Sequence, residues 1–335
     1  MLKYLAVMVL ANSPFRLWPI LWIILLSMGL ILPVLSGSAQ PAVISKTESK
    51  LESVLAAATS ERTSYIEKFR DLLAEEEKTF RLFDREGRVR RSRIVQSTFV
   101  VFQYDEDDSA VAEFRNVLAV DGRPLRDADK RAATFFTELG QAKTSATKLD
   151  KIEKEGSRSD LEHSINGLTL FQAVALAGNL RPAFDFSFVE PKGDEPNGAY
   201  MVSYKQLRES RFILFADGDR RHSDELTLIF DLDDRELRKR SPRLAGIFWI
   251  DKHNYRILRE KRQVFVDDVG ITRGRLLAET DFEYKESEFG MNVPSIIKHT
   301  HFRVSSQRIP EAEIVFRYSS FSKPSVEVRS SEVKN

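Results

Sequence analysis

The chain has 335 residues, with 51 Lys and Arg against 50 Asp and Glu, so its formal net charge is only +1. This balance excludes a global field that would attract nucleic acid, an anionic membrane or a highly charged substrate. Hydrophobic residues make up 42% of the chain and charged residues 30%, which is typical of a globular protein with a substantial core. The absence of cysteine excludes disulfides, thiol catalysis, cysteine-ligated metals and a lipid anchor on cysteine.

The first forty residues have the pattern of an export signal. Lys3 and Arg16 precede an uncharged apolar run over residues 17–35, and small residues follow it up to Ala39. A basic start, an apolar centre and a small-residue exit are typical of a secretory signal peptide. We therefore predict a signal peptide over residues 1–39 and a body that is periplasmic or secreted. The apolar run is also long enough to cross a bilayer, so an uncleaved inner-membrane anchor at residues 17–35 is the alternative.

Helical composition follows this segment. Residues 45–81 are rich in Ala, Leu, Glu and Lys, and their apolar residues fall near helical spacing. This pattern predicts an N-terminal helical segment over residues 40–87. Because its charges are mixed in sign, we expect the helix to pack on a sheet rather than to lie on a membrane surface. The body is then predicted to span residues 88–325, with a tail at residues 326–335.

The body reads as mainly β. Two runs rich in β-branched and aromatic residues, 94–104 and 113–120, are joined by an acidic loop and predict a hairpin. Residues 127–155 and 168–177 have helical composition. Beyond Pro182, nine strand-like runs separated by turn residues predict an antiparallel meander. These runs are 183–189, 200–206, 211–216, 226–231, 244–251, 255–266, 275–285, 293–304 and 311–321.

One hairpin carries a family resemblance. Residues 246–259, with Gly-Ile-Phe-Trp-Ile-Asp in the first strand and Arg-Ile-Leu-Arg in the second, resemble the G-x-x-W-I-D … x-I-x-R hairpin of the lipoprotein-localisation (LolA-like) fold. The runs 275–285 and 293–304 are similar to the strands that follow it in that fold. The resemblance covers roughly residues 184–321, and residues 113–127 also look like a segment of uncharacterised bacterial envelope proteins.

The resemblance and the strand pattern imply the same fold class. We predict an α+β protein with a curved antiparallel sheet, an incomplete barrel, backed by helices and preceded by an N-terminal helical segment. In the LolA-like fold the concave side of such a half-barrel can shelter acyl chains.

The best candidate site is an aromatic sheet face. The run from Phe184 to Phe188 alternates, with three phenylalanines on one face and Asp185 and Ser187 on the other. Such a face is either a groove for an apolar ligand or a core packed on helices. The candidate groove residues are Phe184, Phe186, Phe188, Tyr200, Tyr204, Trp249, Phe282 and Phe302.

Other chemistries have weaker support. His299 and His301 lie on one strand face and could bind zinc, but nothing in the sequence places Asp251, His253, Glu279 or Glu283 beside them. We therefore predict no metal. The chain has no nucleophile elbow and no phosphate-binding glycine loop, so we predict neither catalysis nor a cofactor. The basic cluster Arg235, Arg238, Lys239, Arg240 and Arg243 has acidic neighbours, which indicates a solvated loop.

These observations favour an exported binding or carrier protein for a lipid, a lipidated protein or another hydrophobic ligand. The alternative is a membrane-anchored envelope sensor or scaffold that binds another protein through its sheet edge or its charged strands. An envelope hydrolase is the third hypothesis. Nucleic acid is not expected as a partner.

Overall fold

A computed structural model describes residues 2–7, 46–104, 111–163, 165–191, 198–215, 226–232, 239–268, 271–303 and 309–323. Eleven strands of this part form one large sheet. They are β2 (Leu73–Phe83), β3 (Val89–Gln103), β4 (Val111–Val120), β5 (Arg123–Pro124), β6 (Phe184–Phe188), β7 (Ala199–Gln206), β10 (Pro242–Asp251), β11 (Ile257–Asp268), β12 (Ile271–Glu286), β13 (Asn292–Phe302) and β14 (Pro310–Ser322).

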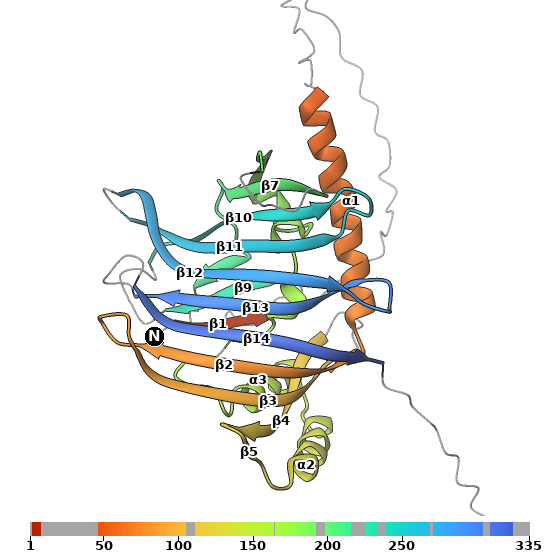
Figure 1. Cartoon of the computed structure of the whole chain (residues 1–335), viewed down its shortest axis with the longest axis vertical. Helices are drawn as coiled ribbons and strands as arrows, with labels where there is room; N and C mark the ends of the chain where they lie inside the picture. Colours follow the sequence, from red (N-terminus) through yellow and green to blue (C-terminus); the bar gives the residue numbers. More distant parts are fainter. Residues whose placement is uncertain are drawn as a thin grey trace, which may run out of the picture.

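The strand order is β5-β4-β3-β2-β14-β13-β12-β11-β10-β7-β6, and every neighbouring pair is antiparallel. The sheet is curved and does not close into a barrel, since β5 and β6 are its two edges (Figure 1). The predicted fold class is therefore confirmed. Inside the sheet β2 pairs with β14, so the first and the last of its strands along the sequence are neighbours.

One long helix, α1 (Lys46–Phe69), crosses the strands and supplies the predicted N-terminal helix (Figure 1). Its buried apolar residues fall on one stripe that packs into the same core as the sheet, as expected for a helix on a sheet. They are Val54, Leu55, Ala58, Tyr65, Ile66 and Phe69. Phe69 lies 6.4 Å from Phe99 of β3, measured between ring centroids.

The prediction of helix up to residue 81 and of a helical segment up to 87 is wrong, because residues 73–83 form β2. Its burial alternates, with Ala74, Glu76, Lys78 and Phe80 buried. The run of glutamates and lysine resembles helix composition, but in the fold two of these charges point inward to buried partners described below. Local propensity is overridden here by tertiary contacts.

Three short 3₁₀ helices follow the two α-helices of the body, α2 (Ala128–Gly140) and α3 (Ser145–Gly156). They are η1 (Leu168–Phe171), η2 (Val174–Leu176) and η3 (Arg181–Ala183). The short helix predicted over 168–177 is thus replaced by two 3₁₀ turns. We call residues 165–183, which contain all three, the plug segment. Its apolar residues, including Phe171 and Leu176, belong to the main core together with inward-facing residues of the sheet.

A second, small sheet has the order β1-β9-β8, with β1 (Leu2–Val7), β8 (Ile213–Phe215) and β9 (Thr227–Leu232). Residues of β8 and β9 also join the main core. The predicted single meander is wrong at this point, because β8 and β9 leave the large sheet and pair in parallel. Within the predicted targeting segment, residues 2–7 pair with β9. Its apolar run, residues 17–35, lies outside the described residues.

Helices α2 and α3 cover the other face of the sheet at β3 and β4. Phe114 of β4 stacks on Phe135 of α2 with ring centroids 4.8 Å apart, and Leu149 and Ile152 of α3 join this second core. The sheet therefore carries helices on both faces. In the part of the chain that the structure describes, no helix is long and apolar enough to span a membrane.

Candidate functional site

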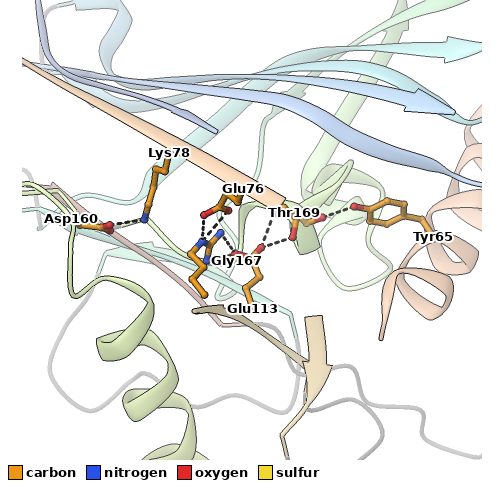
Figure 2. Close-up of polar contacts among 8 residues, drawn as sticks. Tyr65, Glu76, Lys78, Glu113, Asp160, Gly167 and Thr169 are labelled. Atoms are coloured by element: carbon orange, nitrogen blue, oxygen red, sulfur yellow. Dashed lines mark hydrogen bonds and ion pairs between the residues drawn. The ribbon is translucent and has the colours of Figure 1, made fainter. Parts of the chain in front are cut away.

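The inward face of the sheet is closed by the plug segment, and a buried carboxylate holds it. Glu113 of β4 accepts hydrogen bonds from the backbone N–H of Gly167 at 2.9 Å and from the N–H and hydroxyl of Thr169 at 2.8 and 2.6 Å. From the opposite side, Tyr65 of α1 donates its hydroxyl to the carbonyl of Thr169 at 2.8 Å (Figure 2). The plug is thus fixed between the sheet and α1.

Arg115 completes a buried ionic triad with Glu113 and Glu76. Its guanidinium donates to Glu76 at 2.8 and 3.0 Å and to Glu113 at 2.9 Å, and all three side chains are shielded from water. Although burial opposes its charge, the two carboxylates raise the pKa of Arg115 well above its usual value. The Arg115 guanidinium therefore stays charged, and its hydrogen bond holds Glu113 in position for the plug.

Lys78 forms a further buried contact on β2. Its ammonium lies 2.6 Å from the carboxylate of Asp160, in the connection that leads from α3 to the plug (Figure 2). It also lies 5.2 Å from the ring of Phe80 and 5.5 Å from that of Phe316. These contacts explain why Glu76 and Lys78 point into the core, against the usual exposure of such residues.

A second carboxylate, Glu260 of β11, holds the middle of the plug. It accepts from the N–H of Ala173 at 2.9 Å, from the hydroxyl of Tyr204 at 2.9 Å and from Arg262 at 2.9 Å. Arg262 in turn donates to the carbonyl of Phe171 at 2.6 Å. Arg62 of α1 donates to the carbonyl of Gln172 at 2.9 Å, and burial lowers its pKa to about 10.

The contacts to Glu260 also hold a strained backbone. Ala173 has φ 45°, a left-handed conformation that costs a residue with a Cβ about 1 kcal/mol or more. Hydrogen bonds to charged groups contribute about 1.5–3 kcal/mol each. The bonds from Ala173 to Glu260, from Arg262 to Phe171 and from Arg62 to Gln172 therefore offset that cost. The inward face of the sheet is therefore covered by the plug segment, which buried charged side chains hold in place.

The structure separates the predicted aromatic groove into three groups. Phe184, Tyr204 and Phe282 are buried in the main core. Phe186, Phe188 and Tyr200 are half-buried and pack against that core at its border. Trp249 lies in a different cluster with Ala199 and Met201, and Phe302 is half-buried outside the main core.

The half-buried group lies at the edge of the sheet. β6 pairs only with β7 among the described strands, and Phe188 lies 5.8 Å from Tyr200 between ring centroids. Two ammonium groups approach the Tyr200 ring, Lys50 of α1 at 5.2 Å and Lys252 at 5.7 Å. We call Phe186, Phe188 and Tyr200 the edge aromatics. They combine a partly open apolar surface, continuous with the core, with two cations.

His299 and His301 share one strand face as predicted, but this face is buried. Their ring centroids are 5.7 Å apart, and His163 lies 5.2 Å from His301. In the described ranges no group of three metal-binding side chains is arranged to hold an ion. Thr280 shares a 2.8 Å hydrogen bond with Nδ1 of His299. Of the predicted basic cluster, Arg235 and Arg238 lie outside the described residues.

These histidines predict an acid-sensitive fold. Burial, together with the charges of His163 and Arg262, lowers the pKa of His299 from 6.5 to about 3, and burial lowers that of His301 as well. Below pH 6.5 the unfolded chain therefore binds protons that the folded protein does not. We expect the free energy of unfolding to fall by up to about 1.4 kcal/mol per pH unit for each histidine as the pH drops from about 6.5 toward 4.

Urea unfolding at pH 7.5 and pH 5 measures this effect. His299→Gln is expected to reduce the difference in unfolding free energy between the two pH values, whereas His253→Gln, at an exposed histidine, leaves it unchanged. An equal difference in all three proteins would contradict the prediction.

Comparison with known proteins gives a similarity at the level of structure. No protein-family model matches the chain, and no curated protein matches it significantly. A LolA superfamily protein from Nitrosomonas europaea has a TM-score of 0.32 and 11% identity, over 82% of this chain and 94% of that one. The chain is similar to LolA superfamily proteins.

A second similar structure is a putative outer membrane lipoprotein-sorting protein domain from Vibrio parahaemolyticus, with a TM-score of 0.32 and 12% identity. It covers 81% of this chain and 92% of that one.

The sequence analysis did not identify the buried charged residues that hold the plug segment. Glu113, Arg115, Glu260 and Arg262 come as Glu-x-Arg pairs on β4 and β11, and each pair points inward. The only available signal was a charge at alternate positions of an otherwise apolar strand, as in the run from Val111 to Val120.

Proposed function

We propose that this protein is an exported, non-catalytic binding or carrier protein for a lipid or another amphiphile with an acyl chain. The observation that carries the proposal is the set of edge aromatics, a partly open apolar surface that continues into the core. Burying such surface against an acyl chain stabilises binding by about 25 cal/mol per Å². Because the plug fills the inward face, the edge is where a ligand first meets the apolar interior.

The cations at Tyr200 favour an anionic head group. Lys50 and Lys252 extend over the ring, so a carboxylate or phosphate placed there has two ammonium partners while its chain lies on Phe186 and Phe188. An apolar surface with few polar groups at one end is typical of sites for amphiphiles.

Binding of a dansyl-labelled fatty acid, followed by fluorescence, tests this function. We expect the Phe186→Ala/Phe188→Ala double variant to bind about tenfold or more weakly, because it removes apolar surface worth more than about 1.4 kcal/mol. Lys50→Gln is expected to weaken binding of the acid more than that of the matching fatty alcohol.

The control is Phe136→Ala on α2, which removes an exposed phenylalanine that packs on β3 and β4, at the other end of the sheet. It should bind like the unchanged protein. No saturable binding of the probe, or equal losses in the control and the double variant, would overturn the proposal. Native mass spectrometry of protein purified from a bacterial envelope then identifies the co-purifying lipid.

A further inference from the structure

A cavity of about 660 Å³ lies over β13, β14, β2, β3 and β4. Most of its lining side chains alternate with the buried residues of these strands and so face outward, away from the plug segment. Those that matter here are Glu75, Glu77, Gln96, Leu118, Ile296 and Arg317. Ligand pockets commonly have volumes of about 300–1,000 Å³. The cavity is therefore large enough for a small ligand, and it is independent of the edge aromatics.

Four of these residues form one row across the sheet. The strand registers pair Ile296 with Arg317, Arg317 with Glu77, and Glu77 with Gln96. Neighbouring strands are about 4.8 Å apart, so along this row Arg317 lies one strand spacing from Glu77, and Glu77 lies one strand spacing from Gln96.

The row interrupts a pattern of ion pairs. Elsewhere on the outward face, opposite charges are joined: Arg81 to Glu313 at 2.9 Å, Lys298 to Glu313 at 2.8 Å and Lys261 to Glu279 at 2.8 Å. Among the described residues, Arg317 and Glu77 have no ion pair, although they are cross-strand partners. Both charges are available to a ligand.

Glu75 adds a second, positioned carboxylate. It accepts hydrogen bonds from the hydroxyls of Ser319 at 3.3 Å and Ser320 at 3.1 Å. The register of β14 shifts between Ser319 and Ser322, and Ser320 has φ 52°. Such an irregularity re-aims a side chain, and here it brings a hydroxyl to Glu75.

We propose that this outward cavity binds a small zwitterionic ligand of the amino-acid or short-peptide class. Arg317 binds the ligand carboxylate with its planar fork, Glu77 and Glu75 accept hydrogen bonds from the ammonium group, and Leu118 and Ile296 contact an apolar side chain. An extended dipeptide separates its two termini by about 6–7 Å, between one and two strand spacings.

Isothermal titration of the full chain with the dipeptide leucyl-leucine, its N-acetyl form and its C-amide form tests the proposal. We expect saturable binding of the free dipeptide in the millimolar range and at least about tenfold weaker binding by Arg317→Gln and by Glu77→Gln. The amide should lose affinity for the unchanged protein but show no further loss with Arg317→Gln. The N-acetyl form should behave likewise with Glu77→Gln.

Arg81→Gln is the matched control, because Arg81 lies on the same face and strand as Glu77 but does not line the cavity. It should bind the dipeptide like the unchanged protein. Absence of saturable binding up to about 10 mM would overturn the proposal. So would equal effects of Arg81→Gln and Arg317→Gln. Fatty-acid binding at the sheet edge is measured separately, so the two sites stand or fall independently.

Discussion

Arg115→Met is expected to lower the free energy of unfolding by about 3–5 kcal/mol, one of the two largest effects of a single substitution that we predict. The substitution removes the cation that joins Glu76 and Glu113. Glu113 still has Gly167 and Thr169 as hydrogen-bond donors, but Glu76 is left as a buried side chain without its ionic partner. Breaking one member of a buried ionic group costs far more than the group contributes as a whole.

Urea denaturation measures the loss, and Arg81→Met is its control. The Arg81 side chain is 51% exposed and its pair with Glu313 is on the surface, so its removal should cost less than about 1 kcal/mol. Replacing all three charges, as in Glu76→Gln/Glu113→Gln/Arg115→Met, is expected to cost less per residue than Arg115→Met alone. Equal losses for Arg115→Met and Arg81→Met would contradict the role given to the triad.

The same variant also reports on the plug. If Arg115 positions Glu113, hydrogen exchange at the amides of Gly167 and Thr169 should become faster in Arg115→Met, because these N–H groups donate to Glu113. Exchange at Ala173, which donates to Glu260 instead, should change less.

Gly246→Ala is the second substitution with a large expected effect, a loss of about 3 kcal/mol or more. A Cβ at this position would overlap the backbone carbonyl of Lys261 and lie 2.5 Å from the hydroxyl oxygen of Tyr204. The Tyr204 ring crosses the glycine, stacks on Phe248 with centroids 4.5 Å apart and donates to Glu260. Moving the ring would break the hydrogen bond from Tyr204 to Glu260, which helps to hold the middle of the plug.

Gly140→Ala tests whether the loss comes from this overlap. Gly140 is the last residue of α2, and a methyl group added there would have no neighbouring atom within 4 Å, so alanine should be neutral or stabilise by up to about 1 kcal/mol. Thermal or urea unfolding compares the two. A loss in Gly246→Ala no larger than the change in Gly140→Ala would show that Tyr204 can move without cost.

Much of the local structure was predictable from the amino-acid sequence. The alternation from Phe184 to Phe188 and the apolar stripe of α1 predict a strand and a packed helix, because side-chain direction repeats every two residues in one and about every 3.6 in the other. Both are confirmed. So is the curved antiparallel sheet with helices, because a succession of strand-like runs separated by turn residues predicts antiparallel pairing.

The structural features that depend on long-range contacts were not predictable from the sequence. The composition of residues 75–78 predicts a helix. The segment is instead a strand inside the sheet, because Glu76 and Lys78 point inward to partners far away in the chain, Arg115 and Asp160. The pairing of β2 with β14 joins residues from opposite ends of the described chain, as between Arg81 and Glu313. A local pattern carries no information about such a partner.

The aromatic face shows the same division. The sequence places Phe184, Phe186, Phe188, Tyr200 and Tyr204 on one face of two strands, because alternation is local. Whether that face is open or filled depends on the plug segment, and the plug is held by Glu113 and Glu260 through its own backbone N–H groups. Backbone groups are the same in every residue, so no residue type marks them as partners. Only the tertiary structure shows that the plug segment covers the interior and that the edge aromatics are left partly exposed.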